Sequence, residues 1–254
     1  MYRIGYDEPE ECTTPCAFEL PWAVPELPFY AFAAKEIIAQ GAGDAFVFYR
    51  KFLQLMAWQT AERQPFDGFV WMLKCPFHLP YLRELHQTFP GATVVWTHRD
   101  PVECVASACS LYETILHMGM ENHTVDRKAL GLAVLEYTRL ALDKAAETLA
   151  SLGNALHAVH VRYADNVRDP MSVCRQILQQ AGLEVTDEYK LRVEQYLADN
   201  AATRAKLKAS KNKAEMHAYH LSDYGLTEDG VRLLFVDYIN KYDLCEKKGG
   251  KGKR

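Results

Sequence analysis

One pattern constrains the fold of this chain more than any other: a short apolar run, a polar turn and then a helix, repeated three times. The runs are residues 69–73 (FVWML), 92–97 (ATVVWT) and 155–161 (ALHAVHV). Runs that are apolar on both faces and alternate with helices indicate buried parallel strands in βαβ units. We therefore predict an α/β fold with a three-layer αβα arrangement around a parallel sheet, and a mostly helical C-terminal region past residue 185.

Helical periodicity and end signals mark the segments between and after these runs. Apolar residues recur at helical spacing in residues 45–59, including Phe48, Phe52, Leu55 and Met56. Gly182 is placed to end a helix that begins at Pro170. The other predicted helices cover residues 80–88, the segment that begins at Pro101, residues 126–151, and a last amphipathic segment through Tyr242.

Length and composition fit a single domain over residues 1–254. The chain is 49% apolar and 24% charged, which suffices for one sizeable core. Residues 1–28 contain five prolines, which prevent a long helix, so we expect an irregular surface segment there. Residues 247–254 (KKGGKGKR) have the composition of a solvated, disordered basic tail.

Charge and cysteine usage exclude several function classes. A net charge of −4 and a pI near 6.1 argue against a protein that coats nucleic acid or an anionic membrane. No apolar run reaches about 18 residues and no signal peptide is evident, so we expect a cytoplasmic protein without a membrane segment. The seven scattered cysteines are typical of reduced thiols. Cys12 and Cys16 lack a second ligand pair at zinc spacing, so no metal site is predicted.

The three polar turns carry the candidate chemistry. In open parallel sheets, ligands bind beyond the carboxyl ends of the strands, where the strand-to-helix turns gather. The turns are residues 74–78 (KCPFH), 98–100 (HRD) and 162–165 (RYAD). We therefore expect all three to face one crevice.

The turn after the second run has the strongest local signals, in THRDPVECVASACSLY (residues 97–112). Asp100 can cap a helix, Pro101 suits its first turn, and Glu103 is spaced to complete a capping box. The free N–H groups of a helix start favour an anion, and Arg99 can offer a bidentate fork to phosphate. Ser107 lies two turns into the helix, toward the same crevice. The alternative is that Arg99 pairs with a carboxylate and Ser107 only packs.

A strand followed by Arg99 and, eight residues later, Ser107 resembles the 3′-phosphate-binding motif of the sulfotransferases. THRDP followed by a helix rich in small residues is most similar to the large branch of that family with many bacterial members. The resemblance implies a sheet of the P-loop/sulfotransferase type. It also implies that Arg99 and Ser107 hold the 3′-phosphate of 3′-phosphoadenylyl sulfate (PAPS), the co-substrate, with no metal.

The preceding turn, LKCPFHLPYL (residues 73–82), resembles the family's Lys-x-(x)-His-Leu segment. Sulfuryl transfer needs a base for the acceptor hydroxyl proton and a cation for the bridging oxygen of the leaving nucleotide. The resemblance gives the first role to His78 and the second to Lys74. In this sequence Lys74 and His78 are two residues farther apart than in the commonest form of the family pattern. The alternative is that His78 only caps or packs.

Two later segments extend the resemblance to roughly residues 45–242. VRYADNVRDPMSVCRQILQQAG (residues 161–182) resembles the family segment whose tyrosine lies near the adenine, which makes Tyr163 a candidate stacking residue, although Asn166 departs from the usual Leu or Met. Residues 217–226 (HAYHLSDYGL) resemble the family's closing H-x-Y-x-L-x-x-F-G-L box. The basic stretch of residues 204–213 lies near where relatives use a basic loop, although a solvated helix face accounts for it equally.

One family element has no counterpart in the sequence, the Gly- and Ser/Thr-rich loop whose backbone amides cradle the 5′-phosphosulfate. The glycines in AQGAGDAF (residues 39–46) follow no apolar strand. We therefore expect that the sequence starts after that loop and that transfer by this chain is impaired. If a segment before this sequence carried a membrane anchor, we would expect the protein at the Golgi membrane instead of in the cytoplasm.

The predicted function is therefore sulfuryl transfer from PAPS to a hydroxyl or amine of a small-molecule, glycan or lipid acceptor. The alternative is a non-catalytic relative that binds a nucleotide or a partner. A kinase on the same fold would need a Walker-type loop and a Ser/Thr for magnesium, and the sequence has neither.

Overall fold

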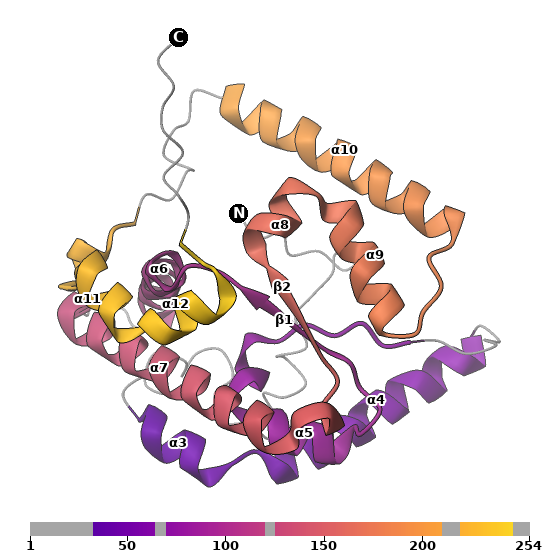
Figure 1. The fold of residues 1–254 in the computed structure, drawn as a ribbon, viewed down its shortest axis with the longest axis horizontal. Helices are drawn as coiled ribbons and strands as arrows, with labels where there is room; N and C mark the ends of the chain where they lie inside the picture. Colours follow the sequence, from indigo (N-terminus) through magenta and orange to yellow (C-terminus); the bar gives the residue numbers. More distant parts are fainter. Residues whose placement is uncertain (1–32, 64–69, 120–124, 210–218, 246–254) are drawn as a thin grey trace.

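A computed structural model of the chain describes residues 33–63, 70–119, 125–209 and 219–245. Its centre is a pair of parallel strands, β1 (Val94–His98) and β2 (Ala158–Arg162), paired from Val94 opposite Ala158 to His98 opposite Arg162. Figure 1 shows both strands running through the middle of the molecule with helices around them. Because the strands are parallel and in register, their carboxyl ends lie together, where the polar turns begin.

Helices make up most of the remaining described chain. The α-helices are α3 (Ala34–Gln40), α4 (Gly43–Arg63), α5 (Leu82–Thr88), α6 (Pro101–Gly119), α7 (Arg127–Leu152), α8 (Tyr163–Arg168), α9 (Pro170–Gln180), α10 (Asp187–Ala209), α11 (Glu228–Leu234) and α12 (Val236–Tyr242). Short 3₁₀ helices are η1 (Pro76–Tyr81), η2 (Gly153–Ala155) and η4 (Leu221–Tyr224). The predicted helices are confirmed, with the last segment divided into α11 and α12 at Phe235. Gly182 ends α9 with a left-handed φ of 71°.

Helices cover both faces of the small sheet, as an α/β fold requires. On one face, Trp96 of β1 packs in a cluster that includes Leu82 of α5 and Ala145 of α7. On the other face, Val159 and Val161 of β2 pack against α9. Each strand is therefore buried mainly on one face, and the exposed Val95 of β1 departs from the prediction that the runs are buried on both.

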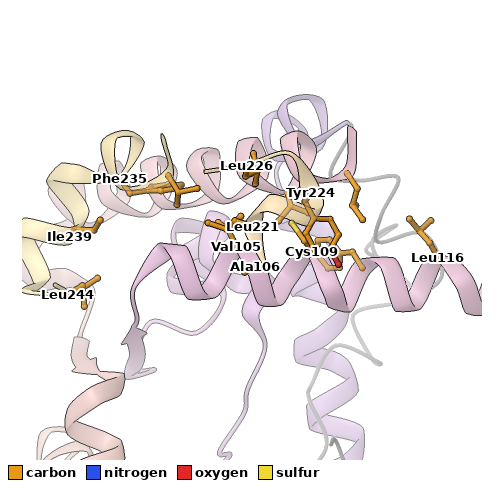
Figure 2. Packing of buried hydrophobic residues seen from close by; sticks show 14 residues of the cluster. Val105, Ala106, Cys109, Leu116, Leu221, Tyr224, Leu226, Phe235, Ile239 and Leu244 are labelled. Carbon is orange, nitrogen blue, oxygen red and sulfur yellow. The ribbon is translucent and has the colours of Figure 1, made fainter. Parts of the chain in front are cut away.

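The largest apolar cluster joins α6 to the C-terminal elements. Figure 2 shows Val105, Ala106 and Cys109 of α6 facing Leu221 and Tyr224 of η4. The same cluster continues through Phe235, Ile239 and Leu244 and includes residues of α7. The C-terminal segment thus holds in place the helix that follows β1.

The first predicted strand is not formed in its described part, residues 70–73; Phe69 lies outside the described residues. Residues 70–75 have no regular secondary structure, and Val70, Trp71, Met72 and Leu73 are between 40% and 71% exposed. A strand needs a neighbour for its backbone N–H and C=O groups, and in the described ranges β1 and β2 pair only with each other. An apolar run without such a neighbour does not become a strand.

The predicted helix over residues 45–59 exists as α4, but its buried face differs from the expected one. Phe46, Tyr49 and Leu53 are buried, whereas Leu55 is 47% exposed. The apolar residues of this helix occupy more than one face, so spacing alone did not select the face that packs. The predictions for residues 1–28 and 247–254 lie outside the described residues.

Candidate nucleotide-binding site

The structure brings Arg99 and Tyr163 together at the carboxyl edge of the sheet. Arg99 follows β1, and Tyr163 follows β2 as the first residue of α8. The guanidinium carbon of Arg99 lies 4.4 Å from the centroid of the Tyr163 ring, a cation–π contact. Both side chains remain partly exposed, at 36% for Arg99 and 38% for the Tyr163 residue. An arginine fork beside an accessible aromatic ring suits a ligand that combines a phosphate with a flat base.

Asp100 fixes the start of α6 as the sequence predicts. Its Oδ1 accepts a hydrogen bond from the backbone N–H of Val102 at 3.0 Å. Its Oδ2 accepts one at 2.7 Å from Nη2 of Arg232, a residue of α11. Asp100 is 7% exposed, so both of its oxygens are committed to fixing the turn.

The predicted capping box at this helix is wrong. Glu103 does not return a hydrogen bond to Asp100; its Oε2 accepts one from Nε of Arg99 at 2.6 Å. Burial lowers the pKa of Arg99, but the hydrogen bond and charge of Glu103 outweigh it and raise that pKa. Arg99 therefore pairs with a carboxylate, the alternative that the sequence left open. The spacing of four residues between Arg99 and Glu103 was the signal for this pair.

Ser107 lies one helical turn beyond Glu103 on α6. Residues four apart share a face of a helix, so Glu103 and Ser107 line the same side. Ser107 is partly buried, and within the described ranges its hydroxyl forms no hydrogen bond. Arg99 bonds to Glu103 and not to Ser107, and Glu103 lies between them along the chain.

Lys74 and His78 lie on a different element, at and just before η1. Lys74 is exposed. The centroid of the His78 ring lies 5.3 Å from the ring centroid of Phe46 and 6.0 Å from that of Tyr49, and both of these residues are on α4. Burial lowers the pKa of His78 to about 4, and its buried Nε2 has no hydrogen-bond partner among the described residues. Among the described residues, His78 makes no hydrogen bond, ion pair or ring contact with Arg99 or Tyr163, so these contacts do not join the turn of residues 74–78 to the other two turns.

An aromatic cluster around the buried His98, behind the carboxyl edge, was not anticipated. His98 is 1% exposed, and its Nδ1 lies 2.9 Å from the hydroxyl of Tyr238 while its Nε2 lies 2.8 Å from Nδ1 of His160. The His98 ring stacks on Tyr242 of α12, with 3.6 Å between centroids. His98 immediately precedes Arg99, and His160 is three residues before Tyr163. The cluster thus ties both strand ends to α12.

Two features are absent from the described part of the chain. No group of three or more His, Cys, Asp or Glu side chains there could hold a metal ion. None of the helices in the described ranges is long and apolar enough to cross a membrane.

Comparison with known proteins identifies the family. The profile of a sulfotransferase family matches residues 19–187, which is more than half of the chain. The chain belongs to this sulfotransferase family. The matched range includes Arg99, Ser107 and Tyr163, as well as Lys74 and His78.

Solved sulfotransferases share the fold. The crystal structure of sulfotransferase STF1 from Mycobacterium tuberculosis superposes with a TM-score of 0.70 at 25% identity, over 93% of this chain and 57% of that one. Sulfotransferase STF9 from Mycobacterium avium superposes with a TM-score of 0.68 at 24% identity, over 83% of this chain and 50% of that one. The α/β sulfotransferase fold predicted from the sequence is therefore confirmed.

A curated relative is similar over part of its length. It is the omega-hydroxy-beta-dihydromenaquinone-9 sulfotransferase Stf3 of Mycobacterium bovis, 30% identical over 134 residues. The same protein of Mycobacterium tuberculosis matches equally. The aligned region covers 51% of this sulfotransferase-family chain but 33% of the relative.

Proposed function

We propose that this chain binds the nucleotide of PAPS and takes part in sulfuryl transfer to a hydroxyl or amine acceptor. The observation that carries the proposal is the contact between Arg99 and Tyr163 at the carboxyl edge of the sheet. Arg99 would grip the 3′-phosphate, Ser107 would donate a hydrogen bond to it, and the exposed Tyr163 ring would stack on the adenine. Membership of the sulfotransferase family supports this choice of ligand.

His78 and Lys74 are the proposed catalytic pair. Burial lowers the pKa of His78 to about 4, so the ring is neutral at pH 7, the form that accepts a proton. Its Nε2 is buried and has no hydrogen-bond partner among the described residues, so the role requires that bound substrates open a path to it. Lys74 would neutralise the charge that develops on the bridging oxygen of the leaving nucleotide. Neither His78 nor Lys74 needs to contact Arg99 for this role, because the 3′-phosphate and the transferred sulfuryl group lie on opposite sides of the ribose.

The acceptor class is part of the proposal. The relative named for a hydroxylated dihydromenaquinone supports a small lipid-like alcohol rather than a macromolecule.

The sequence contains no Gly- and Ser/Thr-rich phosphosulfate loop. We therefore expect this chain by itself to transfer slowly, since such a loop supplies the donors aimed at developing charge. Binding without any transfer would instead favour a non-catalytic nucleotide-binding relative, and rapid PAPS-dependent labelling of an alcohol would contradict the expected impairment.

Calorimetric titration with adenosine 3′,5′-bisphosphate and with 5′-AMP tests the binding site. Removing a hydrogen-bonding charge from a phosphate costs about 1.5–3 kcal/mol, so Arg99→Ala should weaken bisphosphate binding by roughly 10- to 100-fold. Because 5′-AMP lacks the 3′-phosphate, the same change should alter its binding little.

Arg139→Ala is the matched control for this titration. Arg139 of α7 is also an ion-paired arginine, with a side chain 34% exposed beside Glu136 and Asp143. The control should bind the bisphosphate as the wild type does. Equal binding of both nucleotides, or equal losses in the Arg99 and Arg139 variants, would refute the 3′-phosphate site.

A further inference from the structure

The guanidinium of Arg99 is occupied on one edge only. Glu103 places a single oxygen, Oε2, against both Nε and Nη2. The Tyr163 ring covers one face of the group. Arg162, the other arginine at this edge of the sheet, is held more fully, because Nε and Nη2 bond to Asp165 and Nη1 bonds to Asp243. Among the described residues Nη1 of Arg99 has no such partner.

Glu103 stands midway between the two proposed phosphate ligands. It follows Arg99 by four residues and precedes Ser107 by four, on one side of the first two turns of α6. A phosphate that contacts both Arg99 and Ser107 would therefore meet the Glu103 carboxylate. Two anions at one arginine repel each other, so a phosphate placed between Arg99 and Ser107 competes with this position of the Glu103 side chain.

The exposure of the Arg99–Glu103 ion pair favours replacement of the Glu103 carboxylate by a phosphate. The side chains of Arg99 and Glu103 are 36% and 40% exposed, and ion pairs that reach solvent contribute little to stability. A phosphate can bind the arginine through two parallel charge-assisted hydrogen bonds. The Glu103 carboxylate can turn to water, whereas that of the buried Asp100 is fixed by Val102 and Arg232.

We propose that Glu103 is an internal counter-ion of Arg99. It occupies the guanidinium until the 3′-phosphate of a bound nucleotide displaces it. Glu103 thus sets the affinity for the 3′-phosphate: the phosphate must displace this carboxylate from Arg99, whereas a nucleotide with a bare 3′-hydroxyl makes no such exchange. This inference rests on the proposed function, because it assigns the competitor within the same site.

The test compares Glu103→Gln with the wild type by calorimetric titration of the whole chain. The amide keeps the size of the side chain but removes its charge. We expect adenosine 3′,5′-bisphosphate to bind the variant about 3- to 10-fold more tightly, from loss of an exposed pair and of the like-charge repulsion. The affinity for 5′-AMP should stay unchanged. Thermal unfolding without ligand checks that the variant folds.

Glu136→Gln is the matched control. It removes a carboxylate from the exposed pair with Arg139 on α7 and changes the net charge by the same amount. It should leave bisphosphate affinity at the wild-type value, which separates local competition from a general charge effect.

Each outcome bears on the inference. Unchanged or weaker bisphosphate binding by a folded Glu103→Gln protein, while the wild type binds, would overturn the counter-ion role and leave the proposed function intact. Equal gains in the Glu103 and Glu136 variants would overturn it too. Absence of bisphosphate binding in both wild type and Glu103→Gln would refute the proposed function, and the counter-ion role with it.

Discussion

At the scale of single residues, Gly131 marks a close approach between α7 and η4. A Cβ atom added there would lie 2.3 Å from the backbone oxygen of Tyr224 and 2.9 Å from its Cβ. Because the obstacle is the backbone of η4, it cannot move aside like a flexible side chain. We expect Gly131→Ala to reduce the free energy of unfolding by about 1–3 kcal/mol, the usual cost of overpacking.

The control for this prediction is Gly43→Ala at the start of α4. A Cβ atom there would meet nothing within 4 Å. Urea unfolding of both variants measures the difference. If Gly131→Ala is as stable as Gly43→Ala, the close contact between α7 and η4 is not present in solution.

The proximity of Arg99 and Tyr163 could be predicted because both residues follow parallel strands, and parallel strands end at the same edge of a sheet. The partner of Arg99 could not be chosen in the same way. Glu103 had two local possibilities, the backbone at Asp100 and the side chain of Arg99, and both fit the spacing. Only the positions of the side chains decide between a capping box and an ion pair. The roles of all five site residues remain predictions: Lys74, His78, Arg99, Ser107 and Tyr163.

At the scale of secondary-structure elements, Asp100 and Arg232 join the start of α6 to α11. The carboxylate is 7% exposed and the arginine side chain is 37% exposed, with 2.7 Å between Oδ2 and Nη2. Their separation by 132 residues in sequence makes this pair a direct link between the site and the C-terminal segment.

A double-mutant cycle measures this link. We expect Asp100→Ala to cost more than Arg232→Met, because the aspartate also caps α6 through Val102. The coupling free energy between the two changes should be about 0.5–3 kcal/mol, since residues in contact are not additive. Coupling near zero in chemical denaturation would show that α6 and α11 are held only by the apolar cluster.

The elements also show where sequence patterns stop being informative. Helices were predictable because their hydrogen bonds are local and their ends carry Asp100, Pro170 and Gly182 as signals. The run Val70–Leu73 has the composition of a strand as clearly as residues 94–98 do. A strand, however, exists only with a neighbour, and that depends on segments far away in the sequence.

At the scale of the whole molecule, buried histidines make stability depend on pH. Burial lowers the pKa of His98 to about 3, assisted by the charges of His160 and Lys241, and lowers that of His78 to about 4. Both ordinarily titrate at 6.5, so between pH 6.5 and these values the unfolded chain binds more protons than the folded protein. Their stabilising contribution is complete above pH 6.5 and is lost as the pH falls toward 4 and 3.

Replacing His98 tests this dependence against the structure. Each such group contributes a slope of at most about 1.4 kcal/mol per pH unit in that window, so His98→Gln should reduce the slope by up to this amount. Urea unfolding at several pH values between 4.5 and 6.5 would be the measurement. Tyr242→Phe keeps both imidazoles and the stacked ring, and should retain the wild-type slope while shifting the whole curve only slightly. An unchanged slope in His98→Gln would mean that His98 is hydrated and protonates freely in the folded state. Water would then reach His98, and the cluster could not shield both strand ends from solvent where they pack against α12.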